Sequence, residues 1–175
     1  MMSIVQREHP ALRRRAQAVP PEDIPGRKIQ ALLRDMREAL DREEDGVALA
    51  APQIGKSLRI FIVSRKMFPP TAGAIPKDLV FINPAITKLS KKKVPMEEGC
   101  LSVRWLYGFV KRADKATVRA FDERGRPFTR GASGLLAQIF QHECDHLGGI
   151  LFTDKATNIH ELPPPAEKRK HVSKD

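Results

Sequence analysis

The sequence predicts an α+β fold in which short antiparallel sheets pack around a central helix. Apolar residues recur at helical spacing over residues 24–44 and 134–147, and short runs rich in β-branched residues lie between these segments. The strands and helices do not alternate as βαβ units, so we do not expect a parallel sheet. A chain of 175 residues fits one domain, which can bury roughly 70% of the surface that its unfolded form exposes.

The first helix is expected within residues 24–44. Its apolar side chains fall three or four positions apart, which gathers them on one face that can pack against a core. The pattern stops at Asp45 and Gly46, residue types that commonly end a helix. The apolar positions are Ile29, Leu32, Leu33, Met36 and Leu40.

Strands are expected over residues 59–63 and 79–82, which are short apolar runs separated by a loop rich in proline and glycine. Residues 115–129 predict a β-hairpin whose turn runs through residues 122–125. Together these segments favour antiparallel pairing.

The second helix is expected from Gly134 to Leu147. Ser133 stands where an N-cap residue belongs, and Gly148 and Gly149 end the apolar pattern. The last turns of this helix carry the sequence HECDH at residues 142–146.

HECDH is the most informative feature of the chain. His142 and His146 are four residues apart, so a helix presents both imidazoles on one face, where they can bind one ion. Glu143 follows the first histidine directly. This is the HExxH pattern, in which two histidines hold a metal and the glutamate acts on its water.

The third ligand of such a site is open at this point, because catalytic metals typically have three protein ligands. Upstream, Cys100 follows Gly99, a residue that lets backbone approach closely, and a thiolate binds divalent metals well. A buried structural thiol is the equal alternative for Cys100. Cys144 lies on the opposite side of the helix. Downstream, the remaining ligand types are Asp154, His160, Glu161, Glu167 and His171.

The formal charge of +10 suggests an anionic neighbour such as a ribosomal surface, although a basic enzyme without such a partner is an equal alternative. We expect no specific nucleic-acid recognition and no membrane partner. No secretory signal or run of 18 apolar residues is visible, and two cysteines do not make a disulfide framework. These features predict a cytoplasmic protein. We expect one domain over residues 1–160 and an extended or mobile basic tail over residues 161–175.

Three segments resemble peptide deformylases. They are GVALAAPQIG at residues 46–55, EGCLS at residues 98–102 and QHECDHL at residues 141–147. They occur in that family's order, and the hydrophobic pattern between them is similar from about residue 4 to residue 154. The resemblance implies hydrolysis of the N-formyl group from the initiating formyl-methionine of nascent polypeptides.

The resemblance also implies roles for individual residues. Cys100, His142 and His146 become the ligands of one divalent metal, with Fe²⁺ the expected ion and Zn²⁺, Ni²⁺ or Co²⁺ able to substitute. Glu143 becomes the general base and acid. Gln53 becomes a donor to the developing oxyanion, and the backbone N–H of Leu101 is a second donor of this kind.

The substrate is expected to lie along the second helix and two backbone segments. Leu135 and Ile139 stack toward the metal and suit a methionine side chain, although both would also suit an ordinary core. Met96 is expected on the opposite side. In the family, the segment containing Val47 and Ala48 pairs with the peptide as an added strand.

Two further contacts are expected around the metal motif. Glu98 is placed to orient the imidazole of His142. Asp145 faces away from the metal, which predicts a structural ion pair with Arg112.

The chain departs from the family at two places. Ala48 replaces a second glycine, and the stretch after Val103 lacks a usual Pro-Gly pair, having Arg104, Trp105 and Tyr107 there. Two other functions stay open: a conventional HExxH metallopeptidase, and a ribosome-binding protein with a vestigial site.

Overall fold

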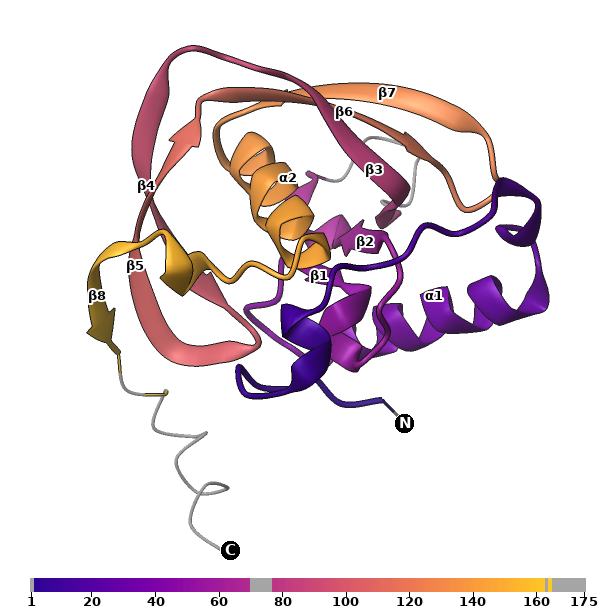
Figure 1. Cartoon of the computed structure of the whole chain (residues 1–175), viewed down its shortest axis with the longest axis horizontal. Helices are drawn as coiled ribbons and strands as arrows, with labels where there is room; N and C mark the ends of the chain where they lie inside the picture. The colour runs from indigo at the N-terminus through magenta and orange to yellow at the C-terminus, as the bar shows by residue number, and fades with distance from the viewer. Residues whose placement is uncertain (1, 70–76, 163, 165–175) are drawn as a thin grey trace, which may run out of the picture.

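The computed structural model describes residues 2–69, 77–162 and 164, and it confirms the predicted α+β class. Within these residues, two antiparallel sheets surround helix α2, which lies in the middle of the molecule (Figure 1). The helices are α1 (Arg27–Asp41) and α2 (Gly134–Leu147). The strands are β1 (Ala48–Ala50), β2 (Ile60–Val63), β3 (Leu79–Leu89), β4 (Lys93–Cys100), β5 (Val103–Ala113), β6 (Lys115–Phe121), β7 (Pro127–Ser133) and β8 (Thr157–Glu161).

The strands divide into a five-stranded sheet of order β1-β2-β3-β6-β7 and a three-stranded sheet of order β4-β5-β8. The chain passes from one sheet to the other between β3 and β4 and returns between β5 and β6. Backbone bonds tie these two crossings together, because Ser90 N–H donates to Lys115 and Asp114 N–H donates to Lys92. The two sheets are therefore joined at one corner, and they diverge from that corner on either side of α2 (Figure 1).

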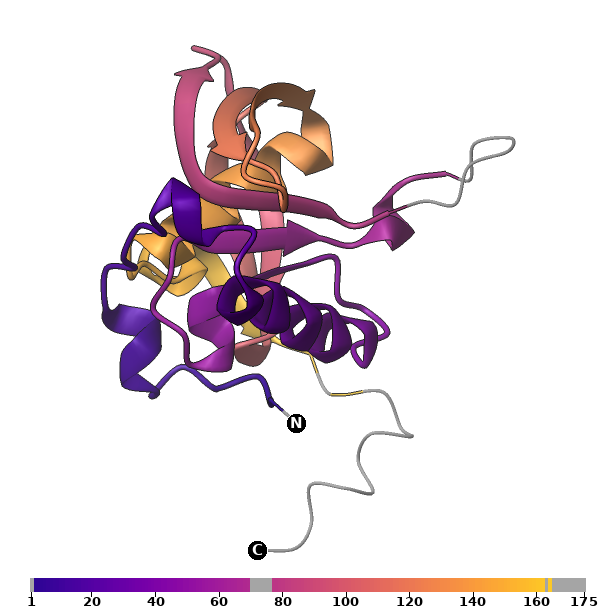
Figure 2. The same cartoon turned by 90° about the vertical axis from the view of Figure 1, so that its right-hand side faces the viewer.

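Each face of the five-stranded sheet packs against a different helix. Side chains of a strand point alternately to its two faces. In β2, Ile60 and Ile62 join the cluster that contains the apolar face of α1, whereas Phe61 and Val63 join the cluster that contains α2. A strand buried on both faces has a continuous apolar sequence, which is why this run was recognisable. Figure 2 shows α1 alongside β2 and β3 in the turned view.

Helix α2 has the predicted bounds, but not the predicted cap. The side chain of Ser133 makes no capping hydrogen bond. Gly134 instead has a φ of 58°, and its N–H donates to the carbonyl of Asp114. At the other end Gly149 has a φ of 77°, and a Cβ there would lie 2.7 Å from the carbonyl oxygen of Arg13. Glycine is required at that position for both reasons.

Helix α1 is shorter than predicted. The helix begins at Arg27 because a 3₁₀ turn over Pro21–Asp23, then Pro25 and Gly26, precede it. After Asp41 the chain turns, with the N–H of Gly46 donating to the carbonyl of Glu43. The predicted helical segment, residues 24–44, therefore extends three residues beyond the observed helix at each end.

The predicted strand 79–82 lies within the longer β3, whereas β2 begins one residue later than the predicted 59–63, and the long hairpin of β4 and β5 was not predicted. Polar and charged residues alternate with half-buried ones along β4, which gives no apolar run. The boundary at residue 161 also differs, because Glu161 is the last residue of β8 and pairs with Leu106. Of the predicted tail, residues 163 and 165–175 lie outside the described part, so its mobility stays a prediction.

Within residues 2–69, 77–162 and 164, no helix has the length and apolar character needed to cross a bilayer.

An aromatic cluster fixes α2 against the five-stranded sheet, and it gives the first testable prediction. The ring of Phe140 is fully buried, with its centroid 5.0 Å from that of Phe81 and 6.3 Å from that of Phe61. We expect Phe140→Ala to lower the free energy of unfolding by about 3 to 5 kcal/mol, because it leaves a cavity. Urea denaturation measures this. Leu89→Ala, at a side chain that is 46% exposed, is the control and should change stability by less than about 0.5 kcal/mol.

Candidate active site

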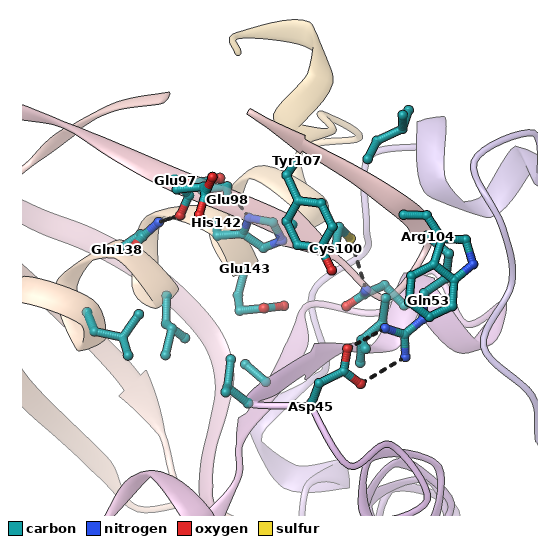
Figure 3. A pocket seen from close by; sticks show the side chains of 18 residues that line it. Asp45, Gln53, Glu97, Glu98, Cys100, Arg104, Tyr107, Gln138, His142 and Glu143 are labelled. Atoms are coloured by element: carbon teal, nitrogen blue, oxygen red, sulfur yellow. Dashed lines mark hydrogen bonds and ion pairs between the residues drawn. The ribbon is translucent and has the colours of Figure 1, made fainter. Parts of the chain in front are cut away.

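A cavity of about 290 Å³ lies where α2 faces β1 and the turn between β4 and β5 (Figure 3). Cys100, His142 and Glu143 reach it from two elements, and Gln53 reaches it from the 3₁₀ segment Ala51–Ile54 after β1. Residues that are far apart in sequence therefore meet in one place.

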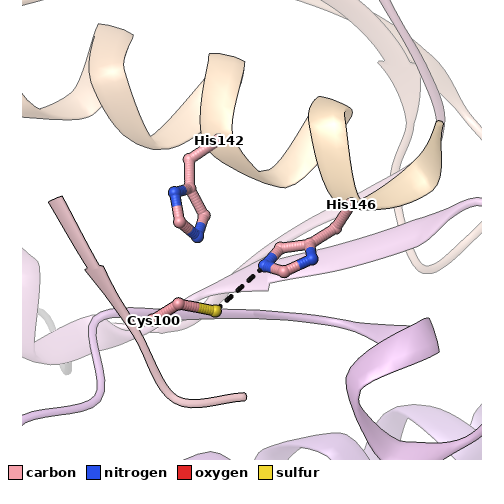
Figure 4. A group of neighbouring side chains, drawn as sticks. All are labelled: Cys100, His142 and His146. Atoms are coloured by element: carbon pink, nitrogen blue, oxygen red, sulfur yellow. Dashed lines mark hydrogen bonds between the residues drawn. The ribbon is translucent and has the colours of Figure 1, made fainter. Parts of the chain in front are cut away.

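Three metal-binding side chains converge at the inner end of this cavity (Figure 4). The ligand atoms of Cys100, His142 and His146 all lie within 4.8 Å of one another. Cys100 Sγ lies 3.2 Å from Nε2 of His146. The β4–β5 register shifts between Gly99 and Cys100, and such an irregularity re-aims a side chain at the end of a strand. Of the two interpretations left open for Cys100, the structure confirms the placement of a ligand.

The site stabilises the thiolate form of Cys100. Burial on its own raises the pKa of this thiol, but the two neighbouring histidines lower it to about 5 from an ordinary value of 9.0. The thiolate is the form that binds a metal. Cys144 differs, because burial raises its pKa to about 12 and its side chain packs against the core around Phe61.

A chain of buried ion pairs orients His142, as predicted. Nδ1 of His142 donates to Oε2 of Glu98 at 2.9 Å. The Arg112 guanidinium donates to both oxygens of Glu98, at 2.6 and 2.9 Å, and to Asp145 at 2.6 Å. Lys155 then reaches Asp145 from the surface at 2.7 Å. The predicted pair of Asp145 with Arg112 is confirmed.

These ion pairs keep Glu98 ionised although its side chain is only 2% exposed. Burial alone would raise the pKa of Glu98, but the bonds from Arg112 and His142 lower it to about 2 from 4.5. Hydrogen bonds with Cys100 and Glu98 raise the pKa of His142 against the effect of burial. Because Nδ1 is engaged by Glu98, Nε2 is the nitrogen that faces the other two ligands.

The donors fit a divalent transition metal. One thiolate and two imidazoles suit Zn²⁺, Fe²⁺, Ni²⁺ or Co²⁺, whereas Mg²⁺ and Ca²⁺ prefer oxygen ligands. Three protein ligands also match the number found in catalytic sites. The Cys100, His142 and His146 group is therefore a site for one divalent metal.

Glu143 lies beside this group with an unsatisfied carboxylate. Its side chain is buried, and within the described chain Oε2 has no hydrogen-bond partner. Burial raises the pKa of Glu143, although the two histidines oppose this effect. A buried carboxylate without a partner is costly unless it has a functional role.

The side chain of Gln53 is held by hydrogen bonds at both ends. Its Oε1 accepts a hydrogen bond from the backbone N–H of Ala50 at 2.8 Å, as a loop amide would. Its Nε2 then points to the metal side, donating to Ser102 Oγ at 3.3 Å and to Cys100 Sγ at 3.5 Å. Leu101, which is buried, follows Cys100 at the same edge of the cavity.

Four of the five residues expected to contact substrate line the cavity, namely Val47, Ala48, Leu135 and Ile139. Ala48 has no positive φ, so the backbone here does not require the glycine that the family usually has. Met96 is the exception. It lies four residues before Cys100 along β4, farther from the metal end, and Glu97 with Gln138 closes that side of the cavity instead.

The stretch after Val103 forms an outer wall that sequence reasoning left unassigned. Tyr107 lies directly over Gly99, where a Cβ would be 2.7 Å from its ring. This explains the glycine before Cys100: a side-chain ring, and not another backbone, lies against it. Arg104 and Trp105 also line the cavity. Neither has a periodic or motif signal in the sequence, because each acts through long-range contacts.

None of the downstream residues considered as a third ligand joins the two histidines within the described chain. Asp154 accepts hydrogen bonds from Arg13 at 2.6 and 3.2 Å. His160 and Glu161 lie in β8, and Glu167 and His171 lie outside the described residues.

The chain is similar to known peptide deformylases in sequence and in structure. The model of the polypeptide deformylase family matches residues 1–161. Peptide deformylase 1 of Bacillus anthracis is 44% identical over 135 residues, which are 77% of this chain and 81% of that protein. A Thermotoga maritima peptide deformylase superposes with a TM-score of 0.78 at 31% identity, covering 90% of this chain and 98% of that one. An Acinetobacter baumannii class I type b enzyme with Met-Ala-Ser bound gives 0.77 at 31% identity, covering 88% and 98%.

The contact of Glu98 with His142 gives the second prediction. We expect Glu98→Gln to weaken zinc affinity roughly 10- to 100-fold, because the neutral amide holds and polarises the imidazole less well. Competition with a chromophoric chelator measures the affinity. Glu97→Gln is the matched control, since its side chain is 52% exposed and should leave zinc affinity within about twofold. Equal affinities in the two variants would contradict the orienting role.

Proposed function

The chain belongs to the polypeptide deformylase family, and on that premise we propose that it removes the N-formyl group from formyl-methionine at the start of nascent polypeptides. Peptide deformylase is a metal-dependent hydrolase. One observation carries this function: the ligand atoms of Cys100, His142 and His146 lie within 4.8 Å of one another, and Cys100 and His142 line a cavity together with Glu143, whose Oε2 has no hydrogen-bond partner in the described chain.

We propose that these three residues hold Fe²⁺ as the native ion, with Zn²⁺, Ni²⁺ or Co²⁺ able to replace it, since such donors accept several divalent ions. When bound, the ion supplies Lewis-acid polarisation and acidifies water. The protein prepares the ligand set by lowering the pKa of Cys100 and by engaging Nδ1 of His142.

Glu143 is proposed as the general base and acid. Its carboxylate accepts a proton from the attacking water as the new C–O bond forms at the formyl carbon. It then gives that proton to the amine nitrogen as the C–N bond breaks, which leaves formate and a free amino terminus. Burial supports this role, because a raised pKa makes the carboxylate a stronger base.

Gln53 and Leu101 are proposed as donors to the oxygen that becomes negative during attack. The Gln53 amide is oriented for this by the bond that Oε1 accepts from Ala50. The backbone N–H of Leu101 follows the metal ligand directly in the chain. Each such donor is worth roughly 3 kcal/mol in a preorganised site.

The peptide is proposed to bind along β1. This strand is the first in the order of its sheet and pairs only with β2 there, so its other edge can accept an added strand. Val47 and Ala48 would pair with the peptide backbone, and Leu135 and Ile139 would contact the methionine side chain. The Acinetobacter baumannii relative was solved with Met-Ala-Ser bound, which supports a peptide that begins with methionine as the class of ligand.

The HExxH metallopeptidase alternative is weakened, because Cys100 supplies the ligand that this alternative would need downstream. A vestigial site is weakened by the unpaired carboxylate of Glu143, whose burial is costly without a role. We propose a cytoplasmic location, since two free cysteines without a disulfide suit a reducing compartment. A contact of the basic tail with the ribosome is a further proposal.

The third prediction concerns Glu143. We expect the iron, zinc and nickel forms to release formate from formyl-Met-Ala under anaerobic conditions, and Glu143→Gln to lower kcat about 10²- to 10⁴-fold with metal content unchanged. Formate production coupled to a dehydrogenase measures the rate. Glu38→Gln, at an exposed position of α1, is the control. No formate from any metal form of the unaltered protein would rule out the function.

The fourth prediction concerns the tail. Residues 164–175 carry four lysine or arginine residues, and we expect their removal to weaken sedimentation with ribosomes, with a stronger effect at low salt. Turnover of formyl-Met-Ala should stay nearly intact, because the cavity is lined by residues 45–143. Ribosome binding that is equal with and without these residues would reject the proposed contact.

A further inference from the structure

We propose that Trp105 is a specificity-determining residue, which forms a fixed wall for an apolar or aromatic side chain at the second or third residue of the substrate. The inference rests on the proposed function, because it concerns the peptide that follows formyl-methionine. It is carried by the backbone of Trp105, by the contacts of Arg104 with its indole, and by the exposed Val47 side chain in the same cavity.

The backbone of Trp105 has an unfavourable conformation. Its φ is 68°, and the other non-glycine residues with positive φ in the described chain are Asn83 and Asn158. Asparagine tolerates this region, whereas a bulky residue does so only at a cost. Such strain persists where the surrounding structure holds it, and it is concentrated at functional sites.

Core packing does not account for this strain. Trp105 belongs to none of the three buried clusters of the described chain, and its side chain is only partly buried. It lines the cavity instead. The gain that offsets the strained backbone is therefore expected at the cavity surface.

Arg104 holds the indole in place. Its guanidinium lies over the Trp105 ring, 5.4 Å from the centroid. It donates to Asp45 at 2.6 Å and also to Glu43, so it joins β5 to the segment between α1 and β1 (Figure 3). The Trp105 carbonyl in turn accepts a hydrogen bond from the N–H of Leu162 at 2.9 Å. With its backbone bonded to Leu162 and its ring in contact with Arg104, Trp105 offers a preorganised surface, which binds at low entropic cost.

The cavity also has an exposed apolar side chain that the methionine does not use. Val47 is 40% exposed and lines the same cavity as Trp105, and its proposed pairing with the peptide uses only its backbone. An apolar or aromatic side chain of the peptide would cover this surface. Aromatic contacts with an indole add to the gain from burial alone.

The carboxylates at the rim of the cavity would favour a cationic peptide side chain. Such a preference is the alternative to the proposed role of Trp105. Asp45 is already bound by Arg104. Glu97 is 52% exposed and lies 3.5 Å from His160. A preference for cationic peptides would point to these carboxylates and not to Trp105.

The experiment compares kcat/KM for four peptides: formyl-Met-Phe-Ser, formyl-Met-Ser-Phe, formyl-Met-Ser-Ser and formyl-Met-Lys-Ser. We expect one of the two phenylalanine peptides to exceed formyl-Met-Ser-Ser about fivefold. In Trp105→Gly this ratio should fall to about 1. Glycine adopts a positive φ without strain, so this variant should fold. Asn158→Gly is the matched control, with φ 52° and outside the cavity lining, and it should keep the fivefold ratio.

Fluorescence gives a second measurement, because Trp105 is the one tryptophan of the chain. In Glu143→Gln, which should bind peptide without rapid hydrolysis, the preferred phenylalanine peptide should shift the emission to shorter wavelength saturably. Formyl-Met-Ser-Ser should shift it less. A merely structural role for Trp105 would leave the emission unchanged.

Several outcomes would overturn the inference. These are equal kcat/KM for the phenylalanine and serine peptides, a phenylalanine preference that Trp105→Gly retains, and a preference for lysine over phenylalanine. Failure of the proposed function looks different, because no peptide would then release formate from the unaltered protein. In that case the fluorescence titration decides by itself whether Trp105 contacts apolar peptide side chains.

Discussion

The active site depends on one buried arginine. The Arg112 side chain is 4% exposed, yet it carries a full charge and binds Glu98 and Asp145. Glu98 belongs to β4, Arg112 to β5 and Asp145 to α2, so one guanidinium joins the three elements that bring the ligands together. Buried ion pairs often add little net stability, but removing one partner is severe because a charge remains unpaired. The arrangement therefore fixes the position of α2 over the strands more than it strengthens the fold.

The same pairing separates the properties of two buried carboxylates. Glu98 has strong partners and stays ionised, with a pKa of about 2. Glu143, in α2, lines the same cavity but has an unpaired oxygen, and burial raises its pKa. Environments that separate the pKa values of two carboxylic acids in this way give the two acids different roles. Glu98 holds a ligand, and Glu143 is left free to exchange a proton.

Local signals predicted the parts of this structure that local sequence determines. The bounds of α2 followed from its apolar period and the glycines beside it, and β2 from a run buried on both faces. The ligand Cys100 was uncertain because no local pattern brings a strand end to a helix 42 residues later in the sequence. The hairpin of β4 and β5 was missed because its half-exposed strands carry charges. Met96 was misplaced because the curvature and length of β4 were unknown.

The two departures of the chain from the family's motifs lie on the peptide side of the cavity. The metal motif and its supporting pairs are complete, whereas Ala48 is in β1 and Trp105 is at the outer wall. This distribution has a physical reason. The ligands and Glu98 share buried charges, so a change at one leaves another unpaired. Residues at the rim contact solvent or substrate, so each can be substituted without leaving a buried charge unpaired. Chemistry and specificity are thus separable in this fold, and Trp105 lies where specificity can vary without cost to the metal site.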